Sequence, residues 1–392
     1  MFKTILVLTL FFNISMFAQT LTINDVLKEI EQNNTRLLAI KETNKQQLLY
    51  LKANHAWQNP EIQAYYLPFG NHRGGDYREI QISQELDLPH VTIQKRRLER
   101  QNTKTLELKY QTERQKILLE AKQLFIEWVM IEKQMEICRE RVKQLTNILN
   151  AIELAFKTKD VSILDVQKAK LLWIETSNRM GKLELKHQNV KIQLNLLNGN
   201  KSLDVVKDIQ FTKIRNEDLD AIWQDKLKTD PEVLYLDHQE EFVDQQFKLE
   251  KAKRFPNITL GINQQETDRI SYFGAMAGIS IPLWKNSKRI KAKASEVVSQ
   301  TLENDFVLQQ KQANFSKAYQ SYQSLVEKYD LYVESFSQIK SEELLLDAFE
   351  MGELSLSEYV LELQFYQNAF DNFLEIEKEL WLAQAHLLKH RL

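Results

Sequence analysis

Hydrophobic residues in this chain follow two periods, and the longer one is typical of helices that pack against each other. From Ile117 to Phe156, apolar side chains recur at alternating spacings of four and three residues, a heptad pattern sustained over more than five repeats. The pattern stops at residues 157–162 and resumes from Val166 to Leu197. It predicts two long antiparallel helices joined by a turn near 157–163. At about 1.5 Å per residue, a first helix from about residue 91 to 156 is on the order of 100 Å long.

The second half of the chain carries the same helical pattern. Apolar residues follow heptad spacing from Phe315 to Ile339, and again from Leu356 to Phe373. The interruption around Gly352 predicts a turn near residues 351–356. A second long helical hairpin is therefore expected.

The shorter period is an alternation of apolar and polar residues, which is typical of strands. It occurs in two glycine-rich windows, 57–89 and 255–286, that hold five of the six prolines. Proline and glycine are unfavourable inside helices. The alternating segments are Glu61–Tyr66, Ile80–Gln84, Ile258–Asn263 and Tyr272–Ile281. They predict one strand pair at about 60–87 around a polar loop at 70–76, and another at about 256–283 around a polar loop at 265–271.

The two halves align at a nearly constant offset. Asp165 and Glu358 follow the two predicted hairpin turns and are 193 positions apart, while Pro60 and Pro256 precede the strand pairs and are 196 apart. Because strand and turn signals shift together, the chain is interpreted as an internal duplication. The first repeat spans 19–198, the second spans 223–392, and residues 199–222 form a linker or equatorial segment.

The first eighteen residues have the features of a signal peptide. A basic residue, Lys3, precedes an apolar run at 5–12, and Met16-Phe17-Ala18 is a suitable cleavage site. A short membrane anchor is the weaker interpretation, because the run is too short to span a bilayer. No later stretch approaches eighteen consecutive apolar residues, so any membrane crossing is expected to be made by strands.

Composition argues against several other classes of protein. The net charge of −2 lacks the basic balance of nucleic-acid-binding proteins, and a single cysteine, Cys138, cannot form an intrachain disulfide. No phosphate-binding loop or zinc motif occurs, so we expect no enzyme, no cofactor and no metal site. His386 and His390 have the spacing of two metal ligands on one helix face, but two ligands are too few. We expect them to lie in a frayed C-terminal turn.

Four strands cannot close a barrel by themselves, and an open edge in lipid leaves backbone groups without partners. Three copies of the chain would supply twelve strands and room for a lumen. The expected fold class is mainly α with a small β part. Long antiparallel coiled-coil hairpins form an α-barrel, and four strands per chain join a shared trimeric transmembrane β-barrel.

Several short motifs, in this order, resemble the TolC-like outer-membrane efflux protein family over nearly the whole mature chain. They are Leu21–Leu27, Asn59-Pro60, Ile82–Leu86, Phe255–Ile258, Gly278–Leu283 and the two hairpin turns. The resemblance implies a homotrimer in the outer membrane of a Gram-negative bacterium, in contact with its lipid, with a long periplasmic portion. It also implies two partners, a periplasmic adaptor of the membrane fusion type and an inner-membrane pump of the resistance-nodulation-division type.

In this family, acidic residues just after the second hairpin turn narrow the periplasmic entrance. The matching residue is Glu358, with Asp165 as its counterpart in the first repeat, and three copies of Glu358 around an axis would favour cations. The alternative is that Glu358 is an ordinary solvated helix residue. Leu354 stands where some members have an arginine that latches the entrance. The resemblance places adaptor contacts at the two turns, at Lys157, Asp160, Gly352, Glu353, Leu354 and Ser355.

The expected function is a passive conduit in a tripartite efflux system. The compact chain is similar to the heavy-metal branch of the family, which favours export of metal cations. Two alternatives stay open: a drug-efflux or type I secretion channel of the same fold, and a periplasmic coiled-coil scaffold that never enters the membrane.

Overall fold

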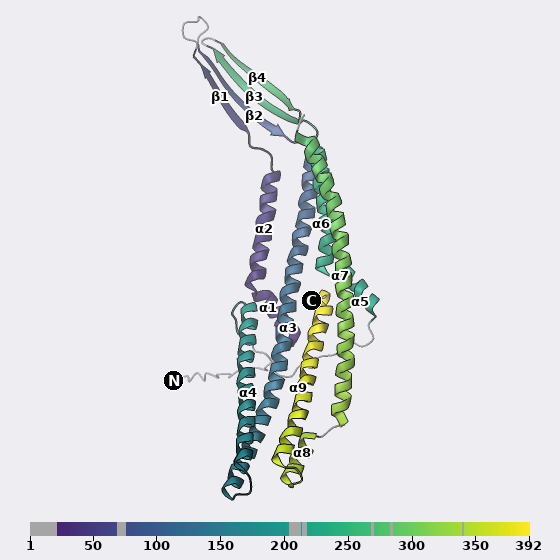
Figure 1. The fold of residues 1–392 in the computed structure, drawn as a ribbon. Coiled ribbons are helices and arrows are strands. Elements are labelled where there is room, and N and C mark those ends of the chain that lie inside the picture. Colours follow the sequence, from purple (N-terminus) through teal and green to yellow (C-terminus); the bar gives the residue numbers. More distant parts are fainter. Residues whose placement is uncertain are drawn as a thin grey trace, which may run out of the picture.

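The molecule is an elongated shaft of helices with a β-sheet at one end (Figure 1). The computed structural model describes residues 22–68, 76–203, 213, 218–267, 270–282, 285–338 and 341–392. The predicted signal peptide, nearly all of the predicted polar loop at 70–76 and most of the linker at 199–222 lie outside these residues. The mainly helical class with four strands is confirmed.

Both halves of the chain contain the same series of elements. The first half consists of α1 (Ile23–Asn33), α2 (Thr35–His55), β1 (Glu61–Leu67), β2 (Tyr77–Leu86), α3 (Pro89–Lys157) and α4 (Ile163–Leu197). The second half consists of α5 (Leu219–Thr229), α6 (Pro231–Ala252), β3 (Asn257–Thr267), β4 (Ile270–Ser280), α7 (Lys285–Gln338), α8 (Ser341–Glu350), α9 (Leu356–Leu387) and the short η1 (Lys389–Arg391).

The heptad residues of α3 and α4 are buried against neighbouring helices. Proline occupies the start of α3, where its missing N–H is not needed, and the helix continues for 69 residues. Its predicted seam is confirmed by buried side chains that include Ile117, Ala121, Trp128, Cys138 and Leu145. Within the described part of the chain, no helix has the length and apolar character needed to cross a membrane.

The second hairpin departs from the predicted single long helix before its turn. Helix α7 ends at Gln338 and a separate helix, α8, begins at Ser341. Near this end, the Ser335 hydroxyl donates to the Leu331 carbonyl at 2.8 Å, and the Ser337 hydroxyl donates to the Glu334 carbonyl at 2.7 Å. Hydrophobic spacing continues to Ile339 and did not predict this boundary between two helices.

At two places halfway along the shaft, one residue separates two helices and the end of a third helix lies against the break. We call these places the first and second joints. At the first joint, Asn34 separates α1 from α2 and its side-chain amide donates to the Leu197 carbonyl at the end of α4 (2.8 Å). At the second joint, Asp230 separates α5 from α6, and the end of α9 lies against this break. Asn34 and Asp230 are both buried and lie 196 positions apart. The joints therefore occupy equivalent places in the two repeats.

The four strands form one antiparallel sheet in the order β1-β2-β3-β4, so the two repeats meet at the β2–β3 pair. The predicted loop at 265–271 was wrong in its extent. Strand β3 continues to Thr267, β4 begins at Ile270, and these two residues are paired in the register. Polar side chains did not end the strands, because ladder hydrogen bonds involve only the backbone.

The end of α4 depends on a glycine with a left-handed backbone. Gly199 has φ +66°, and a Cβ there would lie 2.5 Å from the Asn33 carbonyl oxygen. We expect Gly199→Ala to lower the free energy of unfolding by at least about 1–2 kcal/mol, from left-handed strain alone. The control is Gly181→Ala inside α4, where a Cβ meets nothing within 4 Å. It should raise stability by about 0.5–1 kcal/mol, and equal effects in urea titrations would contradict this account.

Candidate functional site

The sheet has one apolar face and one polar face. Directly paired residues in adjacent strands point to the same face, and the row Ile62, Ile82, Ile262 and Ala275 is apolar throughout. These isoleucines are 72%, 41% and 45% exposed. A surface that faces water would be expected to carry polar side chains. This row of exposed apolar side chains therefore marks a face suited to an apolar environment.

The opposite face carries an ordered polar cluster. The Glu79 carboxylate accepts hydrogen bonds from the Asn263 amide at 3.1 Å, from the Gln265 amide at 3.3 Å and from the Tyr77 hydroxyl at 2.6 Å. These residues come from β2 and β3, and therefore from both repeats. Alternation of this kind, with one lipid-compatible face and one water-compatible face, is the pattern of a membrane barrel wall.

The outer edges of β1 and β4 have no strand partner among the described residues. Strand β4 has 11 residues and β1 has 7, so both edges present rows of backbone donors and acceptors. The backbone donors and acceptors along such an edge form sheet hydrogen bonds only when another strand pairs with it.

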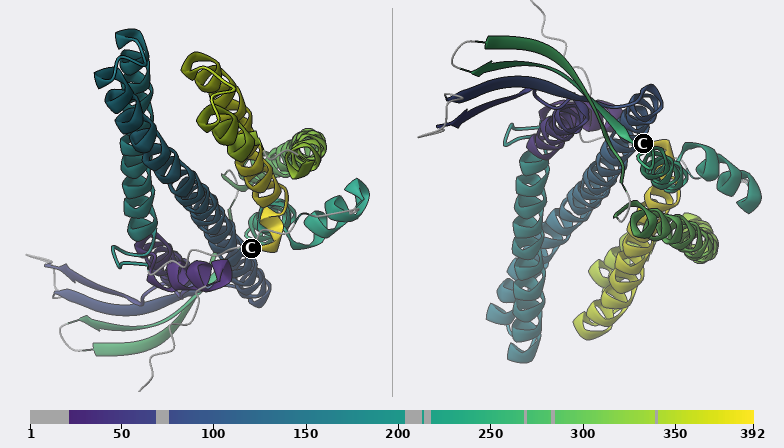
Figure 2. Two further views of the ribbon diagram at one scale, coloured as in Figure 1. Left: turned by 90° about the horizontal axis from the view of Figure 1, so that it is seen from below. Right: turned by 90° about the horizontal axis from the view of Figure 1, so that it is seen from above.

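The two hairpin turns lie together at the end of the shaft opposite the sheet (Figure 2). The Lys168 ammonium of α4 donates to the Ser357 hydroxyl of α9 at 2.8 Å. Around this contact, side chains of both hairpins form one buried cluster, which includes Ile152, Ala169, Leu356 and Tyr359. Residues almost two hundred positions apart thus share one site.

Asp165 and Glu358 have the same local role in the two turns. Each is the third residue of a capping box: the Ser162 N–H donates to the Asp165 carboxylate at 3.1 Å, and the Ser355 N–H donates to the Glu358 carboxylate at 2.9 Å. The serine hydroxyls in turn accept from the backbone N–H groups of Asp165 and Glu358, the third residues of α4 and α9. This signal could be found in the sequence as serine followed three positions later by an acidic residue, but sequence reasoning missed it.

The capping boxes also keep both acids ionised. Hydrogen bonding by the serine partner, first by its side chain and then by its backbone, holds the pKa of the Asp165 and Glu358 carboxyls below their usual values. Both carboxylates lie at the surface of the turns. The first turns of α4 and α9 therefore each carry a negatively charged side chain at neutral pH.

The other predicted turn residues lie around these boxes. Lys157 ends α3, and Asp160 and Glu353 are exposed in the turns, each donating its backbone N–H to a carbonyl five residues earlier. Leu354 packs at the edge of the shared apolar cluster instead of facing outward. Nothing in the described residues tests whether any of them contacts an adaptor.

The two turns differ at one strained position. Gly352 has φ +76°, and Lys159, its equivalent 193 positions earlier, has φ +66°. A left-handed residue closes each helix end, and glycine adopts this conformation without steric cost. We expect Lys159→Gly to raise the free energy of unfolding by roughly 0.5–1 kcal/mol. Lys157→Gly, inside the last turn of α3, is the control and should lower it in the same urea titration.

Farther up the shaft, a buried ion triad connects three helices. Arg141 of α3 donates to the Asp371 carboxylate of α9 at 2.9 Å, and Arg179 of α4 is paired with the same carboxylate. The Arg141 residue is only 5% exposed. Sequence reasoning missed this triad, since its members are far apart in the chain and no local motif marks them.

Charged residues also gather where the chain ends, at the second joint. His390 is 4% exposed and lies 3.2 Å from the Asp225 carboxylate, which also accepts from Arg391 at 3.0 Å. The predicted frayed turn is therefore wrong, because α5 covers this segment. His187, on the heptad seam, lies 2.7 Å from the Glu132 carboxylate. Within the described residues, no group of three or more potential metal-ligating side chains is found.

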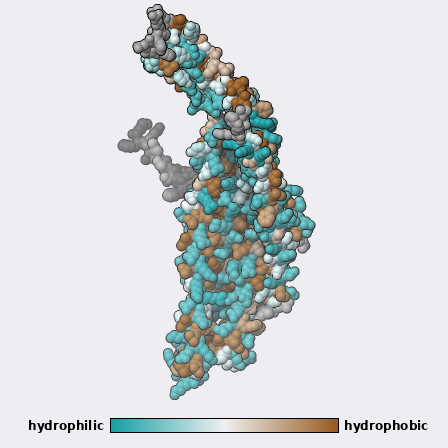
Figure 3. Space-filling view, turned by 45° about the horizontal axis from the view of Figure 1, so that its top comes forward, coloured by the Kyte–Doolittle hydropathy of each residue, from teal (hydrophilic) through white to brown (hydrophobic). Residues whose placement is uncertain are grey.

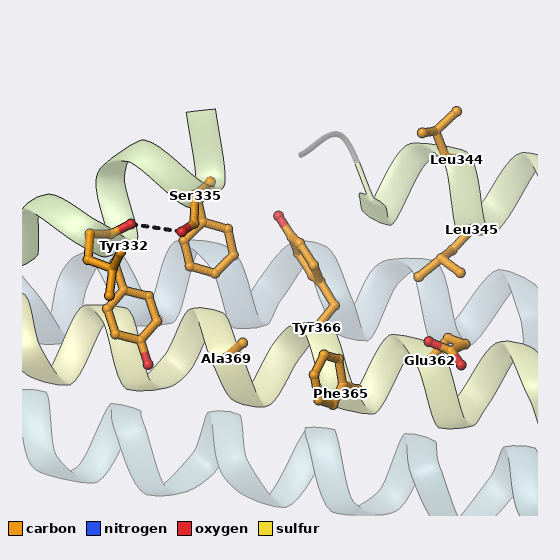
Figure 4. Close-up of a pocket in the computed structure, with 10 residues that line it drawn as sticks. Tyr332, Ser335, Leu344, Leu345, Glu362, Phe365, Tyr366 and Ala369 are labelled. Carbon is orange, nitrogen blue, oxygen red and sulfur yellow. Dashed lines mark hydrogen bonds between the residues drawn. The ribbon is translucent and has the colours of Figure 1, made fainter. Parts of the chain in front are cut away.

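An apolar groove runs between α7, α8 and α9, with a volume of about 530 Å³ (Figure 4). Tyr332, Phe336, Leu345, Phe365 and Tyr366 line it. Phe365 is 75% exposed, which is unusual for a phenylalanine unless another surface covers it. Figure 3 shows further brown patches between hydrophilic ones along the shaft.

Comparison with known proteins gives matches in structure only. No protein-family profile and no curated protein sequence matches the chain. Among solved structures, the CmeC outer-membrane channel of Campylobacter jejuni is similar with a TM-score of 0.74 and 15% identity, over 94% of this chain and 85% of that one. The outer-membrane protein VceC of Vibrio cholerae is similar with a TM-score of 0.73 and 12% identity, over 94% and 96%.

A third similar structure is CusC, described in terms of folding and transmembrane channel formation. It has a TM-score of 0.76 and 14% identity, over 94% of this chain and 91% of that one. At such identities the comparison is one of folds. The structural matches cover 94% of this chain and 85% or more of each of the three compared chains.

Proposed function

Because this chain has the fold of the TolC-like outer-membrane efflux proteins, we propose that it is one subunit of a trimeric outer-membrane channel that acts as a passive conduit for efflux. The observation that carries the proposal is the sheet, with its apolar face, its polar face and two unpaired edges. Three copies, paired edge to edge, would form a closed wall of twelve strands with the Glu79 cluster toward the lumen.

The helical shaft supports the same assembly. The groove lined by Phe336 and Phe365 is apolar and open, and an adjoining copy in a tube would cover it. Mass measurement in detergent tests the assembly directly. We expect a trimer, and a stable monomer would contradict the proposal.

We further propose that the hairpin turns form the periplasmic entrance, where an adaptor and an inner-membrane pump dock. Glu358, held ionised by its capping box, would recur three times around the axis and attract cations there. Asp165 occupies the equivalent place on the neighbouring hairpin. The proposal assigns no bond chemistry to the protein.

Glu358→Gln tests the entrance because it removes the charge while keeping a side chain that suits the third position of a capping box. We expect reconstituted channels of the variant to show a lower cation preference and weaker block by multivalent cations. Stability should change by less than about 0.5 kcal/mol. Reversal potentials in planar bilayers under a salt gradient measure the effect.

Ser355→Ala is the matched control for that experiment. It keeps the Glu358 charge but removes the hydroxyl that accepts from the Glu358 N–H at 3.3 Å. It should cost about 1 kcal/mol of stability and leave ion preference unchanged. Unchanged selectivity in Glu358→Gln would remove the ring from the proposal and leave the acid as a helix cap only.

For the cargo we favour metal cations, supported by the acidic turn and by the resemblance of the compact sequence to the heavy-metal branch of the family. Drug efflux and type I secretion are alternatives on the same fold. Metal and drug sensitivity of a deletion strain would separate them. The periplasmic scaffold is the alternative from a different class, and recovery of the protein in the soluble periplasmic fraction would favour it.

A further inference from the structure

A small cavity of about 180 Å³ lies at the second joint, near the point labelled C in Figure 1. Its wall carries three lysines, a histidine and an asparagine: Lys226, Lys311, Lys389, His386 and Asn314. No acidic residue is among the described residues that line it. A cavity walled by cations and amide donors is unusual, because the charges repel one another unless anions compensate them.

The cations come from separate parts of the fold. Lys226 is on α5 and is only 7% exposed, Lys311 is on α7, His386 is on α9 and Lys389 is in η1. The Lys226 ammonium also lies 5.8 Å from the centre of the Phe315 ring, which closes one side of the cavity. The site is thus built by tertiary packing and not by flexible surface lysines.

Carboxylates behind the wall compensate only part of this charge. Lys311 and Lys389 both donate to the same oxygen of Glu232, at 2.7 Å and 2.9 Å, and Lys226 lies 3.2 Å from the Asp230 carboxylate. Among the residues that the structure describes, three ammonium groups therefore face two carboxylates. Each ammonium has three donors, so donors remain for a ligand in the cavity.

The protonation equilibria agree with a surplus of positive charge. Burial, and then the positive charges of Lys389 and Lys226, hold the pKa of His386 below its usual value, while Glu232 opposes this. The two lysine partners lower the pKa of Glu232 to about 2 although burial alone would raise it. An anion in the cavity would offset the positive charges of Lys389 and Lys226 that lower the pKa of His386.

The first joint provides an internal comparison. There the buried Asn198 donates to the Glu29 carboxylate at 2.8 Å and accepts from the Asn33 amide at 3.0 Å. One lysine, Lys201, donates to Asn33 at 2.6 Å. Two helix ends can therefore meet in this fold with mainly amide contacts, and packing alone does not explain three lysines at the second joint.

We propose that the second joint binds a small doubly charged oxyanion, of the class of inorganic sulfate or phosphate, between Lys226, Lys311 and Lys389. The ion accepts hydrogen bonds from ammonium groups on three elements and so fastens the end of the chain to α5 and α7. The site is on the shaft, away from both the sheet and the hairpin turns. It does not depend on the proposed channel function.

Equilibrium dialysis with labelled sulfate tests the site, using the full chain in detergent with chloride holding ionic strength constant. We expect saturable binding of one sulfate per chain, displaced by inorganic phosphate. Lys389→Met should weaken binding by at least about tenfold, since it removes one charge-assisted contact. The control is Lys317→Met, an exposed residue of α7 that does not line the cavity, and its affinity should equal that of the unaltered chain.

Lys311→Met, on a different element, carries the same expectation and guards against a folding defect in one variant, which circular dichroism would reveal. Sulfate uptake that does not saturate would overturn the proposal. Equal losses in Lys389→Met and Lys317→Met would also overturn it, because attraction by overall charge would then explain the binding.

Discussion

Ile82→Arg is expected to prevent most of the protein from folding into a bilayer. Ile82 is paired with Ile62 and Ile262 in the middle of the apolar face. If this face contacts lipid, an arginine near the bilayer midplane costs about 2–4 kcal/mol in each copy of the chain. Urea titration of folding into phospholipid vesicles measures this cost as a shift of the midpoint.

The adjacent residue gives the matched control. Gln81 lies on the polar face, where it is paired with Gln63 and Asn263. Gln81→Arg places the same side chain on the same strand, one position away, and should cost less than about 1 kcal/mol because the lumen side is wet. Equal costs at the two positions would mean that the sheet does not separate lipid from water, which would favour the scaffold alternative.

Asp371→Asn is expected to destabilise the helical shaft by about 3 kcal/mol. It removes the negative charge of the carboxylate that the buried Arg141 and the partly exposed Arg179 share. Breaking a buried ion pair from one side usually costs about 3–5 kcal/mol. The lower value applies because Arg179 is partly exposed and can turn toward water. Urea unfolding of the detergent-solubilised protein, followed by circular dichroism, measures the loss.

An exposed ion pair on α3, the helix that carries Arg141, is the control. Glu140 and Lys143 lie 3.7 Å apart with side chains that are mostly exposed. Glu140→Gln should change stability by no more than about 1 kcal/mol. A similar loss of stability in both variants would contradict the claim that burial makes the Asp371 ion pairs more important than an exposed pair.

Local periodicity was sufficient to predict most of the fold. The heptads predicted α3, α4 and α9, and the alternation predicted all four strands, because burial on one face imposes a period that is visible in a single segment. The resemblance to TolC-like outer-membrane channels is confirmed at the level of the fold. Fixed spacing also predicted that Asp165 and Glu358 follow equivalent turns.

What the sequence did not predict depends on contacts between distant residues. The triad of Arg141, Arg179 and Asp371 and the cations around Glu232 exist only because separate helices meet. No local pattern encodes such meetings. The end of α7 was missed for another reason, because hydrophobic spacing continues past Gln338.

The joints give the shaft unequal mechanical properties on its different sides. Helix α3 runs past the first joint without a break, whereas α2 and α4 only meet there end to end. A continuous helix resists both compression and bending, because its hydrogen-bond ladder is unbroken. Two abutting helices still bear an axial load but offer little resistance to bending, since no ladder crosses the contact. The shaft therefore combines a continuous helix with two abutting ones at the first joint, and the continuous helix carries most of the resistance to a bending force applied at the hairpin turns.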